Sequence, residues 1–171
     1  MDEYTRLAQK TTEEYIKNGK IIKILEGLPE EFYSRKSGVF VTIFKSDELR
    51  GCVGTYLPAK ENIGQEIIDN AISACSRDHR FLPIDKSDLP YLKYEVSILS
   101  SPQLVEDIKK HNPKRHGLIV RCADGRCGLL LPDLDKIDTI DEQFQIACQK
   151  GGINLEKDGP ILYFFTVEKH A

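Results

Sequence analysis

The chain has 171 residues, of which 40% are hydrophobic and 30% are charged, and its formal net charge is -3. This length suits one cooperative domain, and this balance excludes the low hydrophobicity that keeps chains disordered. A slightly acidic chain with scattered lysines also lacks a general attraction to phosphate backbones. Nucleic acid is therefore not expected as the main partner.

No apolar stretch approaches the ~20 residues that a membrane-crossing helix needs, and acidic Asp2 and Glu3 stand where a signal peptide would be basic. The five cysteines are an odd number at irregular spacing, unlike the disulfide framework of a small secreted protein. We therefore expect a cytoplasmic protein with reduced thiols and no membrane partner.

In the first half of the chain, the sequence predicts a helix at about 2–17 and a loop at 28–32. It then predicts a hairpin of two strands, at 39–44 and 49–57, and a second helix after Asn62. Asn18-Gly19 ends the first helix, and β-branched and aromatic residues favour the first strand. Asn62 with Gln65 is typical of a capping box that opens the second helix.

In the second half, the sequence predicts a strand at 93–98 and a hairpin of two strands, at 117–122 and 126–131. It then predicts a helix after Thr139 and a final strand at 161–167. Asp124-Gly125 is a strong signal for a two-residue type I′ hairpin turn, and Thr139 with Glu142 makes a capping box. Hairpins with few strict strand–helix–strand units predict an α+β fold, with a mainly antiparallel sheet and flanking helices.

Residues 49–55 read Leu-Arg-Gly-Cys-Val-Gly-Thr and place a thiol beside an arginine between two glycines. Side chains alternate along a strand, so Arg50 and Cys52 are expected to share one side. A nearby cation lowers the pKa of a cysteine and activates it as a nucleophile or redox thiol. The structural alternative is that Gly51 and Gly54 permit a bulge or close packing, Cys52 fills a small space and Arg50 pairs with a carboxylate.

A nucleophilic cysteine also needs a base, and His79 and His116 are the candidates because both lie outside the expected regular elements. Sequence spacing does not place either ring beside Cys52, and ordinary surface histidines are the alternative. The candidate catalytic set is Cys52, Arg50, His79 and His116. The candidate ligand-binding set comprises Leu49, Gly51, Val53, Gly54, Asp78 and Arg80.

The other cysteines suggest structural roles. A two-residue turn at 124–125 would set Cys122 opposite Cys127, either as a redox pair or as two reduced packing thiols. Cys75 and Cys148 lie on apolar helix faces and are expected to be slowly reacting core residues. No further ligands stand at suitable spacing, so no metal site is predicted. The basic run 109–116 either binds an anion or is a solvated loop.

Ordered motifs along nearly the whole chain resemble the AMMECR1 family, whose signature is Leu-Arg-Gly-Cys-Ile-Gly, at 37–41, 49–55, 80–83, 95–99, 116–118 and 129–132. The resemblance implies a single domain over 1–171, with two unequal subdomains in one compact unit and the signature near a groove between them. Bacterial and archaeal relatives are associated with Memo-like proteins and radical SAM proteins, which implies such a partner. This chain lacks the cysteine triplet of a radical SAM enzyme, so that chemistry would belong to the partner, and the resemblance identifies no cofactor.

Two hypotheses follow. In the first, the protein is a small enzyme or enzyme subunit in which Cys52 is the nucleophile or redox thiol, Arg50 its electrostatic support or an anion anchor, and a histidine the acid–base group. In the alternative, it is a noncatalytic protein-interaction module whose glycine-flanked strand is structural.

Overall fold

The computed structural model describes residues 2–171 and contains two four-stranded antiparallel sheets with helices packed on them. The chain divides into two compact units, residues 2–99 with 168–171 and residues 100–167. The expected α+β fold with mainly antiparallel pairing is therefore confirmed. Within residues 2–171, no helix combines the length and the apolar character that crossing a membrane requires.

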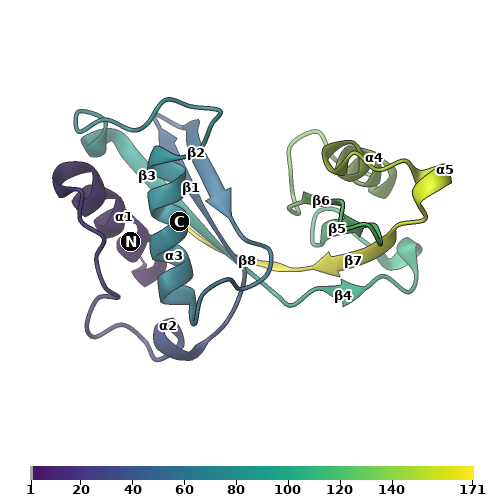
Figure 1. Cartoon of the computed structure of the whole chain (residues 1–171), viewed down its shortest axis with the longest axis horizontal. Coiled ribbons are helices and arrows are strands. Elements are labelled where there is room, and N and C mark those ends of the chain that lie inside the picture. Colours follow the sequence, from purple (N-terminus) through teal and green to yellow (C-terminus); the bar gives the residue numbers. More distant parts are fainter. Residues whose placement is uncertain (1) are drawn as a thin grey trace. The chain divides into compact units, whose positions relative to one another are not determined.

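The first unit is built on a sheet with the strand order β2-β1-β3-β8 (Figure 1). Its strands are β1 (Val39–Lys45), β2 (Glu48–Gly54), β3 (Leu92–Leu99) and β8 (Val167–His170), and its helices are α1 (Glu3–Asn18), α2 (Glu31–Ser34) and α3 (Ile63–Ser76). Helix α3 packs on β1 and β2, and α1 packs on β3 and on α3. Both long helices therefore contribute to one hydrophobic core with the sheet.

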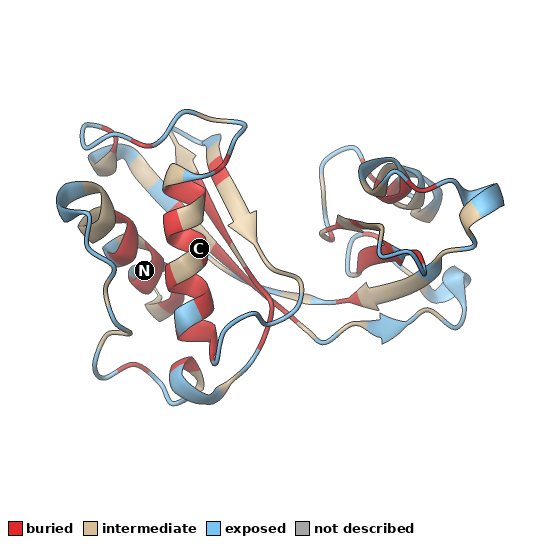
Figure 2. Ribbon diagram, in the orientation of Figure 1, coloured by how far each residue is buried: buried red, intermediate tan, exposed pale blue. Residues whose placement is uncertain are grey.

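Local signals account for the elements of this unit. Asp2 caps α1 by accepting a hydrogen bond from the Thr5 backbone N–H (3.0 Å), and Gly19 ends the helix at φ +65°. Ser46 and Asp47 both have positive φ, which matches the two-residue turn joining β1 to β2. Most residues of α3 are buried, and the helix is mostly red in Figure 2.

The second unit has the strand order β4-β7-β5-β6. Its strands are β4 (Gln103–Leu104), β5 (Gly117–Arg121), β6 (Cys127–Leu130) and β7 (Ile161–Phe165), and its helices are α4 (Ile140–Gly151) and α5 (Leu155–Asp158). Helix α4 packs on β5 and β6 over a core that includes Leu118 and Ala147. The expected capping box of Thr139 and Glu142 is present, and Gly152 ends α4 at φ +61°.

The hairpin of this unit differs from its predicted form. Cys127 stands opposite Arg121, not Cys122, so the expected cross-strand cysteine pair is wrong. The Gly125 N–H donates to the Cys122 carbonyl, and the Cys122 N–H donates to the Arg126 carbonyl (2.9 Å). Only Gly125 has positive φ (+93°) in this turn, whereas a type I′ turn needs two such residues. The loop is therefore one residue longer than the two-residue form, with a bulge at the glycine.

Other boundaries also moved. The second strand of the first hairpin ends at Gly54, three residues earlier than expected, and the expected loop at 28–32 contains the start of α2. The expected strand 161–167 divides at Thr166 into β7 and β8, which pair within different sheets. The short elements β4 and α5 were not predicted because two or four residues carry too little periodicity.

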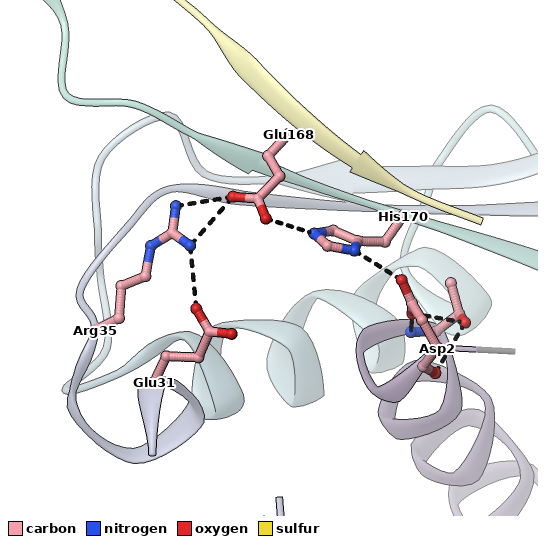
Figure 3. Close-up of polar contacts among 6 residues, drawn as sticks. Asp2, Glu31, Arg35, Glu168 and His170 are labelled. Atoms are coloured by element: carbon pink, nitrogen blue, oxygen red, sulfur yellow. Dashed lines mark hydrogen bonds and ion pairs between the residues drawn. The ribbon is translucent and has the colours of Figure 1, made fainter. Parts of the chain in front are cut away.

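Hydrogen bonds and ion pairs connect strand β8 to helices α1 and α2 of the first unit (Figure 3). The His170 ring lies between two carboxylates, with Nδ1 2.7 Å from Asp2 Oδ2 and Nε2 3.2 Å from Glu168 Oε1. Glu168 also accepts a hydrogen bond from Arg35 (3.2 Å), and Arg35 reaches Glu31 at 3.4 Å. The network therefore joins the C-terminal strand to α1 and α2.

We expect His170→Ala to lower the free energy of unfolding by about 1–2 kcal/mol, because it removes the hydrogen bond with Asp2 and a ring stacked on buried Tyr4 at a centroid distance of 3.8 Å. Urea denaturation followed by circular dichroism measures the change. Lys169→Ala is the matched control at an exposed neighbour and should stay within about 0.5 kcal/mol. Equal effects of the two substitutions would contradict this role of His170.

Candidate functional site

The signature lies on β2, at the edge of the first sheet, and contains a β-bulge. Gly51 stands opposite Ile43 and Leu49 opposite Phe44, so Arg50 is the extra residue. The bulge interrupts the alternation that predicted Arg50 and Cys52 on one side of a regular strand.

The guanidinium of Arg50 is directed to a loop that follows α3. It donates to the backbone carbonyl oxygens of Leu82 (2.6 Å) and Pro83 (3.1 Å), and it lies 3.9 Å from Asp88 Oδ2. Asp88 also pairs with Lys45 at 2.6 Å. Because guanidinium donors match two neighbouring acceptors, Arg50 holds this loop against the sheet edge.

Packing inside the unit accounts for both glycines of the signature. A Cβ at Gly51 would overlap the backbone carbonyl oxygen of Ala74 in α3. A Cβ at Gly54 would overlap the Phe40 ring and the Val39 carbonyl oxygen. A missing side chain therefore lets the edge strand approach the helix at Gly51, as the structural alternative predicted.

Cys52 is half-buried, and its backbone is bonded on the outer side of the edge strand. Its N–H donates to Asp78 Oδ2 (2.9 Å), and its carbonyl oxygen accepts from Arg80 Nη2 (3.1 Å). Its Sγ lies 3.3 Å from the hydroxyl of Thr42, the residue opposite it on β1. Two side chains from one loop thus take the place of a further strand at this position.

Asp78 and Arg80 also bond to each other in a bidentate pair, Nε to Oδ1 at 2.9 Å and Nη2 to Oδ2 at 2.7 Å. The hydrogen bonds from Arg80 hold the pKa of Asp78 well below its usual range, although burial acts in the opposite direction. Asp78 therefore remains a charged acceptor near neutral pH, which suits a structural anchor better than a general base.

Arg80 is the guanidinium that the structure brings to Cys52. Asp78 chiefly raises the pKa of Arg80, and Cys52 contributes a smaller effect in the same direction. Arg80 also lies over the Phe81 ring, 5.4 Å from its centroid. Sequence spacing did not indicate this role, because residues 52 and 80 meet only through the tertiary fold.

The two candidate histidines have separate environments. His79 is exposed, and its side chain makes no hydrogen bond within residues 2–171. His116 belongs to the second unit, where its Nδ1 accepts the Asn112 N–H (3.1 Å) and its ring lies 5.1 Å from that of Phe164. The structure thus gathers Arg50, Cys52, Asp78 and Arg80 of the first unit around one strand edge, and it gives no histidine contact to Cys52 within that unit.

Cys75 and Cys148 are buried, as expected of core residues. All five thiols are free. Burial raises the pKa of Cys75 to about 11 and also raises that of Cys148. Both thiols are thus poor nucleophiles at neutral pH. Among residues 2–171, no three histidine, cysteine or acidic side chains gather in an arrangement able to hold a metal ion.

A buried glutamine in the second unit was missed by sequence reasoning because it looked like an ordinary helix residue. Gln143 of α4 is 1% exposed, and its amide nitrogen donates to the His116 carbonyl oxygen at 2.9 Å. Its Oε1 lies 2.6 Å from His111 Nε2. His111 Nδ1 is buried and has no hydrogen-bond partner within residues 2–171.

We expect Gly51→Ala to lower the free energy of unfolding by about 1–3 kcal/mol, because the added methyl group displaces α3 from the strand. Chemical denaturation measures this loss. Glu48→Ala, at an exposed position on the same strand, is the control and should change stability by less than about 0.5 kcal/mol. A Gly51→Ala protein as stable as the wild type would show that the glycine is not required for packing.

Burial lowers the pKa of His111 in the folded protein, against a smaller opposing effect of Gln143. The unfolded chain then binds this proton more readily, so the second unit should lose stability as the pH falls through about 6.5. Amide exchange in β5 at pH 7.5 and 5.5 measures the loss. His111→Gln should reduce this pH dependence, whereas His79→Gln, at an exposed position, should leave it unchanged. The same dependence in all three proteins would exclude His111 as its source.

Comparisons with known proteins identify the family of the chain and its fold. The AMMECR1 family model matches residues 5–170. A protein of Thermotoga maritima is 45% identical over 168 residues, covering 98% of this chain and 96% of that one. Protein CA_C1420 of Clostridium acetobutylicum is 37% identical, and the match covers 98% of this chain but only 34% of that protein. The crystal structure of uncharacterized protein PH0010 from Pyrococcus horikoshii has a TM-score of 0.87 and 33% identity, covering 97% of this chain and 88% of the other. The chain belongs to the AMMECR1 family.

Proposed function

We propose that this protein is a noncatalytic interaction module whose signature strand presents the loop at 78–83 to a protein partner. One observation carries the proposal: Leu82 is 83% exposed, although its own carbonyl oxygen is held by Arg50 at 2.6 Å. A large apolar side chain on a braced backbone loses little conformational freedom on binding. The signature would then act by positioning the loop.

Two further exposed apolar side chains belong to segments that meet near Arg50. Leu49 is 41% exposed and precedes Arg50, whereas Tyr91 is 63% exposed and its N–H donates to the carbonyl oxygen of Asp88 (2.9 Å). Single exposed apolar residues are ordinary, but a tyrosine and two leucines on neighbouring braced segments suit the centre of an interface.

The proposed partner is a Memo-like protein, with a radical SAM protein as the second choice, as the resemblance in sequence implies. In Clostridium acetobutylicum the matched residues make up 34% of a longer protein. The matched region makes up 96% of the Thermotoga maritima relative but only a part of the Clostridium acetobutylicum protein. Such variation suits a module that acts together with a second protein or domain.

The test measures binding of this chain to a purified Memo-like protein by isothermal titration calorimetry, and then to a purified radical SAM protein. Leu82→Asp should weaken binding at least about tenfold, because a charge would replace an apolar anchor at the interface. Cys52→Ser should bind like the wild type.

Ile21→Asp is the matched control, since Ile21 is 61% exposed in the same unit but lies on the segment after α1. It should leave the affinity unchanged. If neither the Memo-like protein nor the radical SAM protein binds, or if Leu82→Asp and Ile21→Asp weaken binding equally, the proposed surface is wrong.

The second candidate function is thiol chemistry at Cys52, and it is favoured by one contact. Arg80 bonds to the Cys52 carbonyl oxygen at 3.1 Å, so a cation lies beside the backbone of this half-buried cysteine. Genetic complementation separates the two functions. A thiol enzyme requires Cys52 and loses function in Cys52→Ser, whereas an interaction module loses function in Leu82→Asp and tolerates the serine.

A further inference from the structure

The second unit contains a cavity of about 480 Å³ that lies outside the signature. Leu104, Val105 and Phe164 provide its apolar lining, and His111 and His116 contribute two more rings. The His116 ring lies 5.1 Å from that of Phe164 and 5.3 Å from that of His111. This volume falls within the range of ~300–1,000 Å³ that is typical of small-molecule sites.

Hydrogen bonds from outside the cavity hold the rings of His111 and His116 in place. Gln143, which is fully buried, donates through its amide nitrogen to the His116 carbonyl oxygen, so its Oε1 must accept from His111 Nε2–H. His116 Nδ1 accepts the Asn112 N–H, so in the neutral ring Nε2 carries the proton and is a donor. Both rings thus have fixed orientations and tautomers, as a preorganised site requires.

Charges of both signs line the same cavity. Lys110 supplies an ammonium group, and Glu106 and Asp107 supply carboxylates. Asp107 uses one oxygen to accept the Lys109 N–H (3.0 Å), which leaves the other oxygen for a ligand. In the described part of the chain, these three side chains form no ion pair with one another or with any other residue.

A ligand with only one charge would be attracted by the cavity groups of opposite charge and repelled by those of like charge. An anion would suit Lys110 and the His116 donor but would meet two carboxylates, and a simple cation would meet Lys110. An α-amino acid carries a carboxylate and an ammonium on one carbon, so it can pair with both the ammonium and the carboxylates of the cavity. Its side chain can then lie against the ring of Phe164, and aromatic rings pack favourably on one another.

We propose that this cavity binds a free α-amino acid with an aromatic or large apolar side chain. The ligand carboxylate is bound by Lys110 and the Nε2–H of His116, and its ammonium is bound by Glu106 and Asp107. This site lies in the second unit and does not depend on the interaction surface proposed for the first.

The test titrates ¹⁵N-labelled full-length protein at pH 7.5 with three probes and follows backbone amide shifts. L-phenylalanine carries both charges, phenethylamine lacks the carboxylate, and 3-phenylpropionate lacks the ammonium. L-phenylalanine should bind at least about tenfold more tightly than either relative, because each relative leaves one set of charged groups without a partner. The shifts should centre on residues 103–111 and on His116.

Substitutions at exposed side chains assign each charge without disturbing the core. Lys110→Met should bring the affinity for L-phenylalanine down to that for phenethylamine, whose own affinity should not fall. Glu106→Gln should weaken L-phenylalanine and phenethylamine binding but spare 3-phenylpropionate. Lys109→Met is the matched control, because Lys109 follows the same turn but does not line the cavity.

Three results would overturn the proposal. These are tightest binding by phenethylamine or by 3-phenylpropionate, an equal response of Lys109→Met and Lys110→Met, or no shift at the cavity with millimolar L-phenylalanine. Spectra of the variants without ligand confirm that each one is folded.

Discussion

In each unit a helix carbonyl oxygen occupies the space that the side chain of an edge-strand residue would otherwise fill. Gly51 on β2 meets the carbonyl of Ala74 in α3, and Gly128 on β6 meets that of Ala147 in α4. Only glycine permits this approach, because any Cβ would overlap the helix backbone. Much of the signature follows from this contact, since it fixes the strand on which Arg50 and Cys52 lie.

The outward N–H and C=O groups of an edge strand also need hydrogen-bond partners, and the loop after α3 provides them at Cys52. Asp78 accepts a hydrogen bond from the Cys52 N–H, and Arg80 donates one to the Cys52 carbonyl oxygen. Arg50 donates to the Leu82 carbonyl oxygen of the same loop. The strand and loop thereby stabilise each other as one rigid edge. A braced loop of this kind suits recognition, which is why we favour an interaction module over an enzyme.

Local signals in the sequence predicted the regular elements well. The helix caps at Asn62 and Thr139 were predicted from the sequence, because a capping side chain lies within three residues of its partner. Turn types were less predictable, since the type I′ conformation occurs at Ser46-Asp47 and the Asp-Gly turn adopts a longer form.

The candidate site was only partly predictable. Asp78 and Arg80 were expected near Cys52, but their roles depend on backbone bonds between residues 26 and 28 positions apart. The bulge at Arg50 and its contacts with the Leu82 and Pro83 carbonyl oxygens were not predicted, because an inserted residue leaves no signal in the sequence. The Gln143 network was missed because the partners of Gln143 come from a loop that is distant in the sequence.

We infer that the signature holds the loop at 78–83 against the sheet edge and does not activate the thiol of Cys52. Native alkylation of the five cysteines, resolved by peptide mass spectrometry, tests it most directly. Cys127 is the internal reference, because it is also half-buried. Our account predicts that Cys52 is alkylated no faster than Cys127 at neutral pH. Alkylation of Cys52 at least about tenfold faster than Cys127, while the fold stays intact, would contradict it and make thiol chemistry the better account.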